Sequence, residues 1–193
     1  QPDRFGGDEK FAEGLVNRLS ILSAAPTSQK DTGSAPYVKT SVFGGGDIKD
    51  SIWNFSGMSA PIKILQDNTY GVGVTVSTPP LPDTPNFDGT VRSAPLIVSA
   101  NDQIYPSVAL ETLRAFYDQP NYQTRVTPEV GIEWIRMGRQ PPIQTTSTSD
   151  VMITYWNDFD RISASDLTEK TLHGHDGICL LYTSPSPRDL STS

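Results

Sequence analysis

The order of hydrophobic and polar positions in this chain predicts one helix followed by a series of β-strands. In residues 8–22, Phe11, Leu15, Leu19 and Leu22 recur at spacings of three and four residues, the repeat of an amphipathic helix. Asp8 follows two glycines and suits the N-cap position. Residues 23–49 are rich in Ser, Thr, Gly and Pro, which predicts a loop with a short strand at residues 37–43.

Beyond residue 50 the pattern becomes that of a β protein. The segment 70–77 is the clearest strand, because its valines alternate with glycine and threonine. Helices do not alternate with the strands, so we predict a mostly β fold, an antiparallel β-sandwich, rather than a parallel α/β sheet. Two long loops, 78–92 with four prolines and 139–150, separate the strands. The predicted strands are residues 60–65, 70–77, 94–100, 108–117, 131–137 and 151–159.

Charge and cysteine content limit the classes of function. The 193 residues carry a formal net charge of −7, so the chain as a whole lacks the positive field of a nucleic-acid clamp. Its single cysteine is Cys179, which leaves no pair for a disulfide and no cysteine-based zinc site. No apolar run approaches the roughly 18 residues that suggest a membrane span, so we expect none.

The C-terminal segment 179–193 resembles translated sequencing adapter. Its opening, Cys179-Leu180-Leu181-Tyr182-Thr183, can be encoded by the transposase-end sequence of a common library method, so we expect it to lie outside the fold. The chain begins at Gln1 without methionine, and we expect the natural protein to extend further at both ends. We therefore expect an N-terminal helix and loop-rich segment (1–50), a partial β-sandwich (51–162), a polar linker (163–178) and a non-native tail (179–193).

Two groups of polar residues carry side chains suited to catalysis or metal binding. His173 and His175, beside Asp176, are suitable zinc ligands, but they lie in a polar stretch without a third ligand, and a solvated tail is the favoured interpretation. No further histidine is present for a Ser-His-Asp or Cys-His site. Asp158 and Asp160 flank the end of a predicted strand, where solvated acids are favoured over a catalytic carboxylate pair. We therefore assign no catalytic, cofactor-binding or metal-binding residue.

Three further motifs also have an ordinary structural explanation. The triplet Gly44-Gly45-Gly46 could cradle a phosphate, but Lys49 lacks the spacing of a P-loop and a flexible turn is favoured. Asn54-Phe55-Ser56 is an N-glycosylation sequon, which matters only in a secreted protein. The tryptophans could form a sugar-stacking platform, but core or interface packing is the commoner role of such residues; they are Trp53, Trp134 and Trp156.

A family resemblance begins at Gly131. The pattern from this residue onward consists of residues 131–137, a turn with Pro141-Pro142, and residues 146–159 leading into Asp158-Phe159-Asp160. This pattern resembles the last two strands of the capsid jelly rolls of picorna-like viruses of the dicistrovirus and iflavirus type. Residues 109–117 are similar to the preceding strand of those domains, which ends in an aromatic pair. The helix at 8–22 faintly echoes an N-terminal segment of some of these proteins, although its Leu15-Val16-Asn17-Arg18 lacks their serine and first arginine.

The resemblance implies a jelly roll, in which antiparallel strands form two facing sheets. It also implies a structural role: a fragment of a capsid protein of a non-enveloped positive-strand RNA virus, without enzyme activity or cofactor, that self-assembles into an icosahedral shell. The implied partners are other capsid subunits, and genomic RNA bound through regions outside this segment. The implied location is the virion, with assembly in the host cytoplasm.

Two alternatives from other classes stay open at this point. A secreted carbohydrate-binding β-sandwich would explain the three tryptophans, the acidity and the sequon, and it requires two coplanar exposed tryptophans. A carboxylate-based hydrolase requires two acids facing each other across a cleft, about 5–10 Å apart. The exposure of the tryptophans and the placement of the acids distinguish these alternatives.

Overall fold

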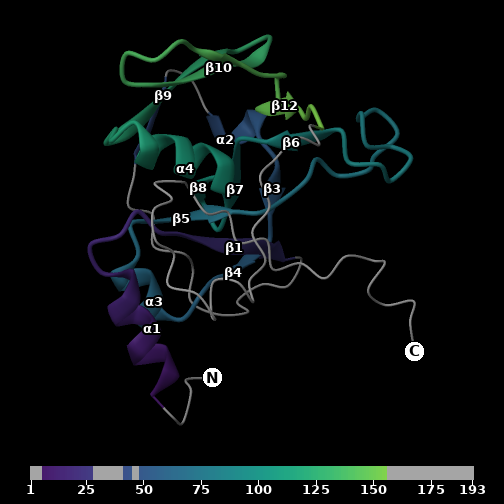
Figure 1. Cartoon of the computed structure of the whole chain (residues 1–193). Coiled ribbons are helices and arrows are strands. Elements are labelled where there is room, and N and C mark those ends of the chain that lie inside the picture. The colour runs from purple at the N-terminus through teal and green to yellow at the C-terminus, as the bar shows by residue number, and fades with distance from the viewer. Residues whose placement is uncertain (1–5, 28–40, 45–47, 156–193) are drawn as a thin grey trace, which may run out of the picture. The chain divides into compact units, whose positions relative to one another are not determined.

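The computed structural model describes residues 6–27, 41–44 and 48–155 (Figure 1). Gln1–Thr154 forms one compact unit, and of the second unit, Tyr155–Ser193, only Tyr155 is described. None of the helices in the described part has the length and apolarity needed to cross a membrane. The described helices are α1 (Gly7–Leu15), α2 (Ile48–Ser51), α3 (Lys63–Asn68) and α4 (Val108–Phe116).

Strands outnumber helices, and the fold is β-rich. The strands are β1 (Ile21–Thr27), β2 (Ser41–Gly44), β3 (Asn54–Phe55), β4 (Gly57–Ser59), β5 (Gly71–Val74), β6 (Ser93–Pro95), β7 (Ile97–Ala100), β8 (Gln103–Pro106), β9 (Asn121–Thr127), β10 (Gly131–Met137), β11 (Ile143–Gln144) and β12 (Asp150–Met152).

These strands form several small sheets of mixed direction. Their orders are β4-β1-β5, β11-β10-β9-β2, β12-β6 and β3-β7-β8. The pairs β1–β5, β2–β9 and β3–β7 are parallel, and the others are antiparallel. The expectation of a purely antiparallel sheet is therefore wrong for the described strands. Parallel partners need a long crossover, and the chain between β1 and β5 supplies one that contains α2 and α3.

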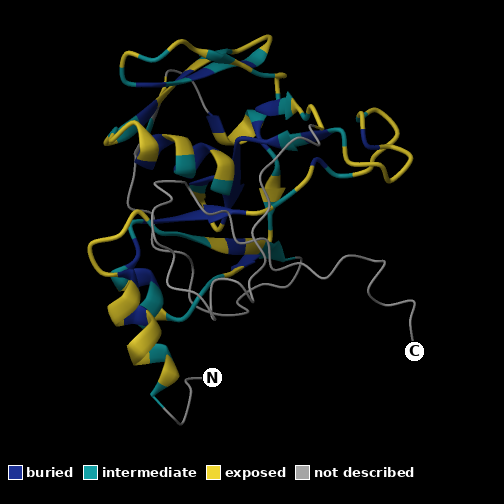
Figure 2. Cartoon of the chain, viewed as in Figure 1, coloured by how far each residue is buried: buried dark blue, intermediate teal, exposed yellow. Residues whose placement is uncertain are grey.

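Two clusters of buried side chains form the core (Figure 2). The larger joins α2 and α4 to β7, β9 and β10, with Leu110, Tyr122 and Ile135 fully buried at its centre. The smaller lies around β4, β5, β7 and β8 and includes Met58, Val98 and Tyr105. Helix α4 packs closely on β5, because Gly73 has no side chain: a Cβ there would lie 2.5 Å from the Val108 Cα atom.

Helix α4 corrects the largest error in the predicted secondary structure. Residues 108–117 were expected to be a strand, and they were part of the capsid resemblance. Ser107 instead caps a helix, with its hydroxyl accepting a hydrogen bond from the Leu110 amide at 3.2 Å, and such caps start helices. The buried positions are Leu110, Glu111, Arg114 and Ala115, which share one helical face. A helical pattern was therefore present, but polar residues inside that face concealed it.

Helices α1 and α3 show the same effect of tertiary context. The predicted helix 8–22 ends at Leu15, because Val16 is extended and Asn17 has φ of 59°. The chain then joins the sheet as β1, where Ile21 pairs with Gly71 and Ala25 with Ser59; these residues were expected to be the end of the helix and the start of a loop. Residues 60–65, expected as a strand, instead lead into α3.

Other predictions agree with the structure in whole or in part. The strand 131–137 is confirmed as β10, and 70–77 contains β5, which is buried on both faces rather than one. The segment 94–100 is interrupted at Leu96 between β6 and β7. Within 151–159 only β12 is a described strand, and residues from 156 onward lie outside the described part. Strand β10 pairs with β9 and β11, whereas β12 pairs with β6, so these two strands do not form a hairpin.

Candidate functional site

A buried ion pair lies between α4, β5 and β9. Glu111 and Arg114 are one helical turn apart, with relative exposures of 1% and 5%. The carboxylate accepts from Arg114 Nη2 at 2.7 Å and from Arg114 Nε at 3.0 Å, and it also accepts from the Tyr122 hydroxyl. Two parallel N–H···O bonds are the strongest geometry for such a pair. Arg114 Nη1 donates to the Gln119 carbonyl at 2.8 Å, so the guanidinium is also anchored to the end of the helix.

The surroundings of this ion pair are closely fitted. Gly71 leaves room for the carboxylate, since a Cβ there would lie 2.2 Å from Glu111 Oε1. The Arg114 guanidinium lies 4.9 Å from the centre of the Tyr70 ring, a cation–π contact. Burial, together with the charge of Glu111, raises the pKa of Tyr122. The side chains of Glu111, Arg114 and Tyr122 bond to one another, so this cluster fixes α4 against β5 and β9.

A second buried carboxylate, Asp150, ties three separate loops together with neutral donors. Trp53 donates its indole N–H to both carboxylate oxygens, at 3.1 and 3.2 Å, and the Thr78 hydroxyl donates at 2.7 Å. Thr146 donates at 3.1 Å, and Thr148 also donates. Asp150 is 4% exposed, and its oxygens are satisfied by these bonds. The carboxylate therefore joins these loops, although Thr146 at the edge of the network is exposed.

The segment 78–92, here called the proline loop, is held closed at its base by Asn86. The Asn86 side chain is 2% exposed. It donates to the Thr78 and Ser93 carbonyls at 2.8 and 3.0 Å, and it accepts from the Arg92 and Ser93 amides at 2.7 and 3.0 Å. The Asn86 side chain therefore adds four hydrogen bonds to the one backbone bond that joins the two ends of the loop, from the Thr78 amide to the Ser93 carbonyl at 3.1 Å.

Further contacts stiffen the body of the proline loop. Arg92 binds both oxygens of Asp88, at 2.6 and 2.8 Å, and also the Pro85 carbonyl at 3.0 Å. The hydrogen bond from Arg92, followed by that from the Thr90 amide, holds the pKa of Asp88 well below its usual value. Thr84 donates to the Pro79 carbonyl at 2.7 Å. Prolines at positions 79, 80, 82 and 85 further restrict the backbone, because each fixes its own φ.

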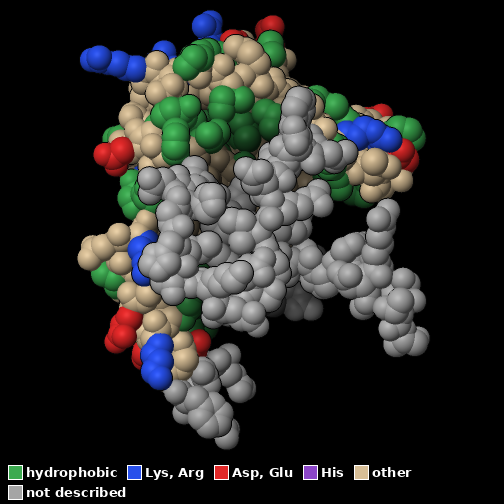
Figure 3. All heavy atoms as spheres, viewed as in Figure 1, with side chains coloured by type: hydrophobic (Ala, Val, Ile, Leu, Met, Phe, Trp, Pro, Cys, Tyr) green, Lys and Arg blue, Asp and Glu red, His purple; other side chains and the backbone are tan. Residues whose placement is uncertain are grey.

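This stiff loop exposes large apolar side chains. Phe87 is 65% exposed, Leu81 is 48% exposed and Val91 is 37% exposed, and most of the loop is exposed in Figure 2. Figure 3 shows hydrophobic, acidic and basic side chains side by side on it. A single exposed apolar residue needs no explanation, but a group of them on one ordered loop suggests an interaction surface.

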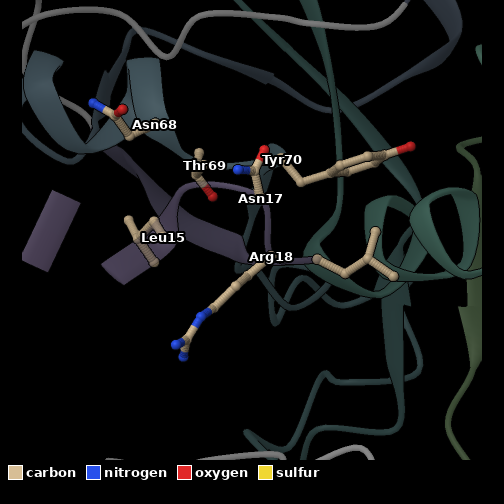
Figure 4. A pocket seen from close by; sticks show the side chains of 7 residues that line it. Leu15, Asn17, Arg18, Asn68, Thr69 and Tyr70 are labelled. Atoms are coloured by element: carbon tan, nitrogen blue, oxygen red, sulfur yellow. The ribbon is translucent and has the colours of Figure 1, made fainter. Parts of the chain in front are cut away.

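A hollow of about 450 Å³ lies between the end of α1 and the turn from α3 into β5 (Figure 4). Leu15, Leu19 and Tyr70 supply its apolar lining, and Asn17, Arg18 and Asn68 are among its polar ones. Leu19 is 68% exposed. The hollow therefore combines an apolar surface with a cationic side chain, and no residue of the proline loop lines it.

The residues singled out from the sequence do not meet at one site. His173, His175, Asp158, Asp160 and Trp156 lie outside the described residues. Gly44 ends β2, and the other two glycines of its triplet lie outside the described residues. Asn54 is exposed and its side-chain oxygen accepts from the Ser99 hydroxyl at 3.0 Å.

The two described tryptophans do not provide the exposed platform that sugar stacking requires. Trp53 is half-buried, packs against the smaller core cluster and donates to Asp150. Trp134 is half-buried with the Arg136 guanidinium 5.3 Å from its ring centre. The carbohydrate-binding hypothesis therefore loses the contribution of Trp53, which serves the core.

The sequence predicts the position of the proline loop but not the contacts that hold it rigid. The four prolines predicted a loop; neither its anchor, Asn86, nor the hollow at Leu19 carried a local signal. Within the described ranges, no group of three or more His, Cys, Asp and Glu residues could hold a metal ion. Comparisons with models of protein families, with curated proteins and with solved structures found no match for this chain.

Proposed function

We propose that this chain is a fragment of a capsid protein of a non-enveloped positive-strand RNA virus, and that it acts by self-assembly into a shell. The observation that carries the proposal is the segment from Gly131 to Met152. Strands β10 and β12 follow one another along the chain in the order of the capsid resemblance, with Pro141-Pro142 and the short β11 between them, although β12 pairs with β6 and not with β10.

The surface of the chain supports a role in association. Large apolar side chains are exposed on ordered elements, among them Phe11, Phe87, Phe116 and Met152, each at least 54% exposed. Assembly interfaces place such side chains at buried centres surrounded by polar residues. Other capsid subunits are therefore the partners that we propose, and the virion is the proposed location.

The jelly roll belongs to the same proposal. It accounts for the β-rich fold and for the antiparallel run β9-β10-β11. Helix α4 and the parallel pairs depart from a regular jelly roll, so the proposal requires a variant that accommodates both.

The nucleotide sequence that flanks this reading frame tests the viral origin. The proposal predicts a frame that continues into further capsid domains or an RNA polymerase. A frame that instead joins a secretory signal peptide to an early stop codon would contradict it and favour a secreted protein.

A further inference from the structure

We propose that the proline loop of one copy of this chain docks into the hollow beside Leu19 on a second copy. This inference rests on the proposed function, since it names a contact through which the subunits associate. The same chain carries both parts: a convex loop with apolar side chains, and a concave surface with an apolar lining.

The loop is suited to docking because it is ordered before it binds. The bonds of Asn86 close its base, and the Arg92–Asp88 pair fixes its body. A surface that is already ordered loses less conformational freedom on association. Phe87 is the most exposed of its large apolar side chains, and aromatic anchors of this kind dominate binding when a pocket covers them.

The hollow is suited to receive such an anchor. It has a volume of about 450 Å³ and is open to solvent, so an aromatic ring can lie against its lining. Leu15, Leu19 and Tyr70 would contact the ring. At 68% exposure, Leu19 has more surface to lose on docking than Leu15, which is 8% exposed.

Charge favours this pairing over others. Arg18 lines the hollow and Asp83 is exposed on the loop, and neither side chain forms an ion pair within the described ranges. The chain carries a net charge of −7, so most approaches of two copies bring like charges together. A contact that places Asp83 near Arg18 brings opposite charges together and so helps to select one orientation.

The contact is head to tail, because the two surfaces are different parts of the molecule. Each copy uses its loop toward one neighbour and its hollow toward another. Contacts of this type extend into rings or shells when the rotation between copies closes, and into filaments when it does not.

Sedimentation velocity of the full chain over a range of concentrations tests the contact. We expect Phe87→Asp on the loop, or Leu19→Asp in the hollow, to weaken self-association by roughly 10-fold or more. Val130→Asp is the matched control, since Val130 is 55% exposed in the turn between β9 and β10 and belongs to neither surface. The thermal midpoints of all three variants should match the wild type, because the replaced side chains are largely exposed.

Mixing the variants gives the sharpest result. The Leu19→Asp chain keeps its loop and the Phe87→Asp chain keeps its hollow, so an equal mixture should form a heterodimer through one intact contact and no larger species. A mixture that stays monomeric while the wild type associates would overturn the head-to-tail contact.

The possible failures are distinguishable. Wild-type self-association that neither variant weakens overturns this contact and leaves the proposed function standing. A wild type that stays monomeric at all concentrations overturns this contact and also removes the support of self-assembly from the proposed function. A flanking sequence of non-viral origin would overturn the proposed function alone, because sedimentation measures the contact directly.

Discussion

The buried pair of Glu111 and Arg114 gives the most quantitative prediction about stability. Replacing Glu111 with leucine leaves the Arg114 guanidinium buried without its carboxylate and leaves the Tyr122 hydroxyl without its acceptor. Breaking a buried pair by removing one partner costs about 3–5 kcal/mol. The single change Arg114→Met should destabilise the protein by a similar amount. The Glu111 carboxylate, which is 1% exposed, then keeps only the hydrogen bond from the Tyr122 hydroxyl.

The double variant separates the pair from its surroundings. With both charges removed, the Gln119 carbonyl loses its donor at the half-buried end of the helix, and the main remaining defect is the buried Tyr122 hydroxyl, worth about 1–3 kcal/mol if it stays unsatisfied. We therefore expect the double variant to be more stable than either single variant, with a coupling energy of at least about 2 kcal/mol. Adding Tyr122→Phe should recover most of the remaining loss, since apolar groups of similar volume often replace a buried pair without cost.

Urea denaturation followed by tryptophan fluorescence measures these differences, provided that the m-value is unchanged. Lys63→Met is the control, because its ion pair with Asp67, at 2.6 Å, is exposed and should contribute no more than about 1 kcal/mol. Single variants that cost less than about 1 kcal/mol, or costs that simply add in the double variant, would refute the assignment of a coupled buried pair.

Four other predictions follow from individual contacts. The raised pKa of Tyr122 keeps its hydroxyl protonated in the folded protein above a pH of about 10, while the same hydroxyl ionises in the unfolded chain. The free energy of unfolding should therefore fall by roughly 1.4 kcal/mol per pH unit from Tyr122 alone. Tyr122→Phe should reduce the pH dependence of the urea midpoint, and an unchanged slope would contradict this. Gly73→Ala should cost at least about 1–3 kcal/mol, since the new Cβ would meet the backbone of Val108; a wild-type thermal midpoint would show that α4 lies further away. Asn86→Ala should speed amide hydrogen exchange across the proline loop, and unchanged exchange would mean that another contact closes it. Deleting residues 179–193 should leave the thermal midpoint and the near-UV aromatic signal unchanged, because that segment is polar with two prolines and no apolar periodicity. A fall of several degrees in the thermal midpoint would identify the segment as part of the fold.

The sequence predicted those elements whose pattern is local. Strand β10 combines apolar side chains with polar ones between two turns, and its bounds were predicted correctly. Helix α4 was missed because its buried face contains Glu111 and Arg114. These two charged residues interrupt the repeat of apolar residues by which a helix is recognised in a sequence. Strand β1 was missed because its identity depends on β4 and β5, which are distant in sequence.

The candidate surfaces also combine features with a local sequence pattern and features that depend on distant residues. Four prolines predicted a loop between residues 78 and 92, but the Asn86 hydrogen bonds that order it depend on both ends of the loop meeting. The hollow brings Leu19 beside Tyr70, which follows only once β1 and β5 are paired. A single sequence contains no signal for either arrangement.

The claim that this chain works by closed self-assembly is tested most directly by electron microscopy of the purified full chain after concentration. The account predicts closed particles or rings of uniform diameter, because a specific contact repeats with a fixed rotation. A field of monomers only, open filaments, or amorphous aggregates without a repeated diameter would contradict it.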